Sequence, residues 1–128
     1  MASRVLTLRC DVVIKDLLCR AIREYAHAAY PEGGSDCAQV ARYTLLEAAS
    51  AIDTAISADH AEAAVSRRLR TNLQAAIDYY FDRLDAASGT ASVHQRAVLA
   101  GLLKGESLSR AELEAAVAAD GGNTDTMQ

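Results

Sequence analysis

Side chains from Arg4 to Cys10 alternate between two faces, one apolar and one largely polar, as in a β-strand. The strand is predicted from Arg4 to Cys10, and its two faces are formed by Leu6, Leu8 and Cys10 and by Val5, Thr7 and Arg9. A lone strand cannot satisfy its backbone hydrogen-bonding groups, so it must pair. The nearest candidate is its own copy in a second subunit, and the pattern therefore predicts a homodimer.

Two amphipathic helices are predicted after this strand, because apolar residues then recur every three or four positions. The first begins after a cap at Asp11 and ends near Ala29. The second begins after a cap at Ser35 or Asp36 and ends near Ser57. A segment containing proline and two glycines separates them and forms a turn. The residues expected to face inward from the second helix are Val40, Thr44, Leu45, Ala48, Ala49 and Ile52.

A third helix, the longest, is predicted from Asp59 to Gly89. Asp59 and Glu62 have the spacing of a capping box, and Gly89 can end the helix in the left-handed conformation. Its apolar stripe suits a core or an oligomer contact and consists of Val65, Leu69, Leu73, Ala76, Ile77, Tyr80, Phe81 and Leu84. For the adjacent aromatic residues Tyr79, Tyr80 and Phe81, core packing is favoured over base stacking, because neighbouring helix positions point in different directions.

Two shorter helices complete the prediction. The fourth runs from Ser92 to about Gly105, and the fifth begins with a capping box at Ser109 and ends near Ala119. The expected fold class is thus mainly α, with an N-terminal unit of one short strand and two helices and an extension of about three helices. The expected parts are residues 1–57, 58–120 and a flexible tail at 121–128.

Composition describes a folded chain that is unevenly charged. About half of the 128 residues are hydrophobic, and 13 basic against 17 acidic residues give a net charge of −4. Residues 1–50 are balanced, with six of each sign, so the acidic excess lies in the remainder. No membrane-spanning or signal segment is recognisable, which favours a cytoplasmic protein.

The sequence holds no pattern typical of a catalytic or metal site. Glycine-rich phosphate loops, nucleophile elbows and HExxH pairs are missing from the sequence, so an enzyme is not expected. The three cysteines and three histidines have no metal-binding spacing. Buried or idle thiols and surface or capping histidines are the favoured interpretation, with no metal and no cofactor.

The order of strand, helix, glycine-containing turn and helix resembles the ribbon-helix-helix DNA-binding family. Residues 7–11 resemble that family's strand and its junction with the first helix. Residues 34–45 resemble its turn and second helix. The resemblance covers about the first two fifths of the chain. It implies a dimeric, sequence-specific DNA-binding protein, such as a transcriptional repressor or a plasmid or phage accessory factor.

The resemblance also implies a role for particular residues. Two paired strands would enter the major groove of double-stranded DNA and present Val5, Thr7 and Arg9 to the base edges. Phosphate contacts would come from the helix N-terminus that follows the turn and from the start of the strand. These phosphate-contacting residues would be Arg4, Ser35, Asp36 and Cys37.

A second basic patch is predicted at Arg67, Arg68 and Arg70. No acidic residue lies three or four positions away from any of them, so local ion pairs do not neutralise their charge. The patch could contact phosphates or an acidic partner, while a solvated helix face or pairing with another helix is the alternative.

Three other interpretations remain open at this point. The strand could be an ordinary edge strand whose polar face meets water. The chain could be a protein-interaction module, such as an antitoxin or another inhibitor, that binds a protein partner through the alanine-rich acidic helices of residues 58–120. Residues 4–10 could also be a disordered lead-in to an all-helical bundle.

Overall fold

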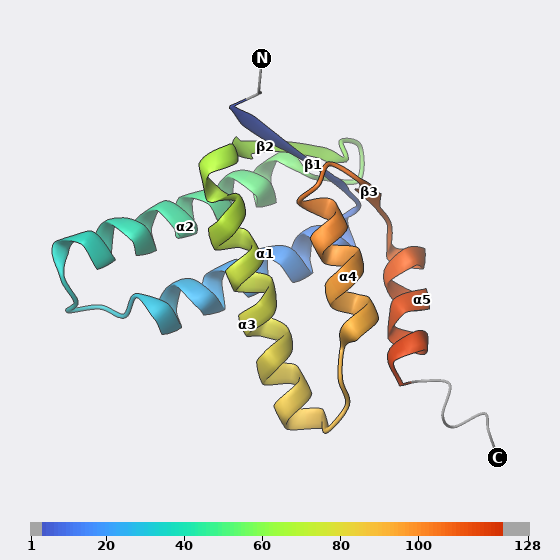
Figure 1. Ribbon diagram of the computed structural model, residues 1–128. Coiled ribbons are helices and arrows are strands. Elements are labelled where there is room, and N and C mark those ends of the chain that lie inside the picture. The colour runs from blue at the N-terminus through green and yellow to red at the C-terminus, as the bar shows by residue number, and fades with distance from the viewer. Residues whose placement is uncertain (1–3, 122–128) are drawn as a thin grey trace.

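The computed structural model describes residues 4–121, in which five α-helices pack against a small three-stranded sheet (Figure 1). The mainly α fold class is confirmed, whereas the ribbon-helix-helix arrangement is not. The elements are β1 (Val5–Cys10), α1 (Val12–Ala29), α2 (Asp36–Ala55), β2 (Glu62–Ser66), the 3-10 turn η1 (Arg67–Leu69), α3 (Arg70–Ser88), α4 (Val93–Leu102), β3 (Ser107–Leu108) and α5 (Arg110–Asp120).

β1 is the central strand of the sheet, whose order is β2-β1-β3. It runs antiparallel to β2, with Leu6 opposite Val65, and its last residues run parallel to β3. β2 therefore pairs with one edge of β1 along residues 5–9, and β3 pairs with the other edge at Arg9 and Cys10. The prediction that this strand pairs with its copy in a second subunit is wrong, because β2 and β3 supply the backbone partners instead.

β2 occupies a segment that was predicted to be the start of the third helix. Ala63 and Val65 are buried, and Glu62 is exposed, as expected for a strand with one covered face. The predicted capping box at Asp59 is wrong for this reason, and α3 begins only at Arg70. The predicted end is confirmed, because Gly89 caps α3 with a φ of 75°, a conformation that glycine adopts without strain.

α1 and α2 form an antiparallel hairpin (Figure 1). The cap at Asp11 is confirmed, since its side chain accepts a hydrogen bond from the Ile14 amide at 3.1 Å. Ser35 caps α2 by accepting from the Ala38 amide at 3.2 Å. Val40 and Thr44 were predicted to face inward, but both are exposed, because α2 is covered only on the side that faces α1 and β2.

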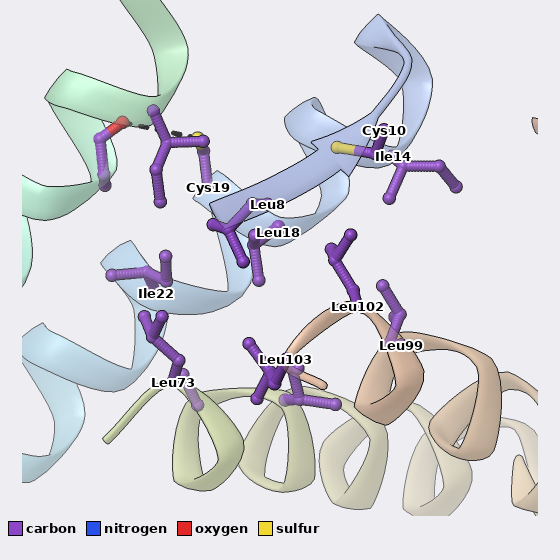
Figure 2. Packing of buried hydrophobic residues seen from close by; sticks show 14 of the residues in the cluster. Leu8, Cys10, Ile14, Leu18, Cys19, Ile22, Leu73, Leu99, Leu102 and Leu103 are labelled. Carbon is purple, nitrogen blue, oxygen red and sulfur yellow. Dashed lines mark hydrogen bonds between the residues drawn. The ribbon is translucent and has the colours of Figure 1, made fainter. Parts of the chain in front are cut away.

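One hydrophobic core joins the N-terminal and C-terminal halves. Leu8 of β1 lies against Leu18 of α1, and side chains of α3 and α4 complete the cluster, as Leu73 and Leu102 show (Figure 2). The boundary predicted after residue 57 is therefore crossed by two strand pairings and by a shared core.

Polar contacts between helices hold α4 and α5 in place. Arg96 of α4 donates hydrogen bonds to Asp85 at 2.9 Å and to Asp82 of α3. Asp120, the last residue of α5, accepts hydrogen bonds from two amides at the start of α4. The capping box at Ser109 is confirmed. Except for Gly121, the predicted tail at 121–128 lies outside the described residues.

The three cysteines are expected to differ sharply in reactivity. Burial raises the pKa of Cys10 to about 12 and that of Cys19 to about 11, whereas Cys37 is exposed on α2. Cys19 also donates a hydrogen bond to the Ala49 carbonyl at 3.3 Å, drawn dashed in Figure 2. Because the thiolate is the reactive form, a maleimide should label one cysteine in the native protein and three after unfolding. Native labelling that persists in Cys37→Ser would contradict this.

Candidate nucleic-acid interface

The sheet has one covered face and one open face. Leu6, Leu8 and Cys10 of β1 are buried against the helices, as the alternating pattern predicts. Val5 and Arg9 are exposed on the opposite face, and Thr7 between them is partly exposed. These three residues were predicted to point outward from the strand, and that orientation is confirmed.

A shallow groove of about 330 Å³ lies beside β1. Its walls come from exposed and buried residues of β1, from the start of α3 and from the segment between α4 and β3. The lining residues are Val5, Leu6, Thr7, Arg9, Arg67, Arg70, Leu103, Lys104 and Gly105. The fold thus brings two of the three arginines of the predicted second basic patch next to the strand residues.

Three cations of this groove have no internal counter-charge. Within residues 4–121, no carboxylate lies at ion-pair distance from Arg67, Arg70 or Lys104. All three side chains are exposed. We call them, together with Arg4, the basic rim. Arg4 belongs there because its carbonyl accepts a hydrogen bond of 2.9 Å from the Arg67 amide, which places the two residues side by side.

The helix dipole adds to the positive potential of the basic rim. α3 starts at Arg70 and has no acidic residue in its first turn. Arg67 and Arg70 therefore lie at the positive end of a helix, where cations are disfavoured by a few tenths of a kcal/mol each. A bound anion would relieve this repulsion, so the arrangement suits a negatively charged ligand.

Arg9 is held in place by two contacts, unlike the basic rim. Its guanidinium donates a hydrogen bond of 3.0 Å to the Gly105 carbonyl and lies 3.9 Å from the carboxylate of Glu62 on the neighbouring strand β2. Gly105 has a φ of 90°, which a residue with a side chain would adopt only under strain. This turn aims its carbonyl at Arg9 and orients the guanidinium on the open face.

The other predicted phosphate-contacting residues lie elsewhere. Ser35, Asp36 and Cys37 are at the tip of the α1–α2 hairpin, at the end away from the sheet (Figure 1). The structure does not bring them together with β1. Arg68 is exposed on η1 but does not line the groove.

Lys104 is the member of the basic rim that the sequence did not single out. It is an isolated lysine after α4, and only the pairing of β3 with β1 brings that segment to the sheet. The signal available beforehand was weak, namely a lysine next to a glycine at a predicted helix end.

Comparisons with known proteins add no identity. The sequence matches no protein-family model, and no curated protein and no solved structure shows significant similarity to it. No helix among the described residues combines the length and hydrophobicity that a membrane span requires. Residues 4–121 also hold no cluster of three or more histidine, cysteine or acidic side chains placed to bind a metal ion.

Proposed function

We propose that this protein binds double-stranded DNA through the open face of its sheet, as a transcriptional regulator or a related accessory factor would. The observation that carries the proposal is the basic rim, in which four cations without a carboxylate partner among residues 4–121 lie in or beside the groove next to β1. Exposed cations clustered without counter-charges create a local positive potential that attracts a polyanion. The phosphates of a duplex supply negative charge at regular spacing.

The basic rim and Arg9 have different roles in this proposal, because only Arg9 is oriented by contacts with the rest of the chain. The basic rim can follow phosphates, which gives affinity without sequence preference. Arg9 is oriented by two contacts and is suited to guanine O6 and N7, while Thr7 and Val5 can contact neighbouring base edges. Sheets are known to read DNA grooves in this way. In this proposal a three-stranded sheet from one chain takes the place of a ribbon shared by two copies.

The experiment that tests the proposal is a titration of random duplexes followed by fluorescence anisotropy at two salt concentrations. With four phosphate contacts, affinity should fall about 100-fold between about 50 and 200 mM salt. In the double variant Arg67→Ala/Arg70→Ala, the logarithmic salt slope should shrink by about 2. Neither side chain has a partner in the described chain, so the fold should be unaffected.

Two further variants make the result specific. Arg20→Ala removes an exposed arginine of α1 that is not part of the groove, and it should leave affinity unchanged. Arg9→Ala should relax the sequence preference of the bound pool more than it lowers total binding. Salt-independent binding by the wild type, or an equal loss in Arg20→Ala, would reject the proposal.

A second candidate function is protein binding, and one observation favours a particular surface for it. Val40 and Tyr43 on α2 are 65% and 66% exposed, which is unusual for large apolar side chains. The acidic helices themselves are less suited to the role. Arg96 already neutralises carboxylates along α3, including Asp82 and Asp85. This candidate becomes the stronger one if the duplex titration fails.

A further inference from the structure

A second cleft of about 510 Å³ opens between α3 and α4, and it continues the groove on the sheet. Its lining residues are Arg70, Thr71, Gln74, Ala75, Asp78, Ala100, Leu103 and Lys104. Arg70, Leu103 and Lys104 line both cavities. The volume lies within the range of small-molecule sites, roughly 300–1,000 Å³.

Charge is arranged along this cleft with opposite signs at its two parts. Arg70 and Lys104 lie where it joins the sheet groove and have no carboxylate partner among the described residues. Asp78 lies farther along α3, accepts a hydrogen bond of 3.3 Å from the side-chain amide of Gln74 and lies 3.9 Å from the Arg96 guanidinium, which offsets part of its charge. An anion is favoured near the two cations, whereas the part of the cleft near Asp78, whose charge is shared with Arg96, offers a second anion no free cation.

The remaining lining suits an uncharged body. Ala75 and Ala100 contribute small side chains from the facing helices, which leave room for a planar ring. The Thr71 hydroxyl and the side-chain carbonyl oxygen of Gln74 have no protein partner among the described residues, so both can form a hydrogen bond with a polar ligand. Asp78 can accept a hydrogen bond from an amino or hydroxyl group.

We propose that the α3–α4 cleft binds a small phosphomonoester of nucleotide size, with its phosphate on Arg70 and Lys104 and its uncharged ring body between the helices. A continuous phosphodiester backbone fits less well, because Arg70 and Lys104 are the only cations that line the cleft and the one carboxylate in its lining, Asp78, already pairs with Arg96. Since the two cavities share both cations, the ligand competes with DNA. The competition, but not the binding of the small ligand, rests on the function proposed above.

The test uses adenosine monophosphate as the probe, with adenosine and inorganic phosphate as separate arms, followed by amide chemical shifts in the full chain. The monophosphate should bind at least about tenfold more tightly than either arm, because only it engages both ends of the cleft. Shifts should map to the first two turns of α3 and to residues around Lys104. Equal affinity for adenosine, or no saturable shift with the monophosphate, would overturn the proposal.

Variants with larger side chains in the cleft test the monophosphate site separately from DNA binding. Ala100→Leu places a larger side chain in the cleft and should weaken the monophosphate about tenfold or more without lowering duplex affinity. Ala75→Leu fills it from the opposite wall, in case the first variant disturbs α4. Ala97→Leu, an exposed change on α4 outside the cleft, is the control.

The outcomes distinguish the two proposals. A monophosphate that binds the wild type and Ala97→Leu but not the filled variants supports the cleft site, whether or not DNA binds. Unchanged monophosphate affinity in both filled variants overturns the site while leaving the DNA proposal intact. If DNA and the monophosphate both bind, the monophosphate should displace duplex from the wild type but not from Ala100→Leu, and failure to displace overturns the competition.

Discussion

Leu8→Ala is expected to lower the free energy of unfolding by about 3 kcal/mol. Leu8 is fully buried at the centre of β1 and lies in the core shared by both halves of the chain (Figure 2). Truncating it removes buried apolar surface and leaves a cavity that a strand held by its pairing with β2 cannot readily close. Urea unfolding followed by circular dichroism measures the change as a shift of the midpoint.

Thr7→Ala is the matched control for this variant. Thr7 is the next residue on the same strand but points to the open face, so the cost should stay below about 1 kcal/mol. Similar losses in the two variants would contradict the assignment of the two faces.

The same measurement tests whether the sheet is formed within one chain. β1 pairs inside the chain with β2 along residues 5–9 and with β3 at Arg9 and Cys10, so the unfolding midpoint of the wild type should not change with protein concentration. A strand ribbon shared by two copies would raise the midpoint as concentration increases. An unfolding midpoint that rises clearly with protein concentration would therefore indicate an obligate dimer.

Features determined by neighbouring residues could be predicted from the sequence. The two faces of β1 follow from a period of two over six residues, and the caps at Asp11 and Ser109 depend on contacts within three residues. The absence of local ion pairs at Arg67 and Arg70 was also predicted, because the nearby positions hold no carboxylate, whereas pairing with another helix was left open.

Features determined by distant pairing could not be predicted. β2 alternates Ala63 and Val65 with Glu62, and alanine is equally compatible with a helix, so the segment was assigned to the third helix. Without β2, the only partner available to β1 was a second copy. One missed strand thus produced both the dimer prediction and the wrong start of α3.

The candidate site shows the same limit. Arg9 and Arg70 lie in segments predicted as two separate patches, and their approach depends on β2 leading directly into η1 beside β1. Lys104 joins them only because β3 pairs with β1. The residues that carry charge were therefore mostly identified, but not their arrangement as one groove.

Asp120→Ala is expected to destabilise the C-terminal part of the fold by about 2–3 kcal/mol. The Asp120 side chain is only 2% exposed and accepts hydrogen bonds of 2.7 Å and 2.9 Å from the amides of His94 and Gln95. The side chains of both residues bond to it as well. Asp120 thus acts as the N-terminal cap of α4 although it belongs to α5, and its loss leaves several donors without a partner.

Glu114→Ala is the control, because Glu114 is an exposed acidic residue of the same helix whose one ion-pair partner within residues 4–121 is Arg110. Its loss should cost less than about 0.5 kcal/mol. Amide hydrogen exchange should show faster opening of α4 and α5 in Asp120→Ala than in Glu114→Ala. Equal exchange rates in the two variants would contradict the role of Asp120 as the cap of α4.

The acid dependence of stability follows from the same contact. Burial alone would raise the pKa of Asp120, but the hydrogen bonds from His94 and Gln95 outweigh it and lower the pKa to about 2. Because this pKa is below the unfolded value of about 3.9, the charged carboxylate stabilises the folded state above about pH 4. That contribution should decline as the pH falls from about 5 to 2. The wild type should therefore lose more stability over this interval than Asp120→Asn, and parallel acid profiles would show that the carboxylate charge is not what caps α4.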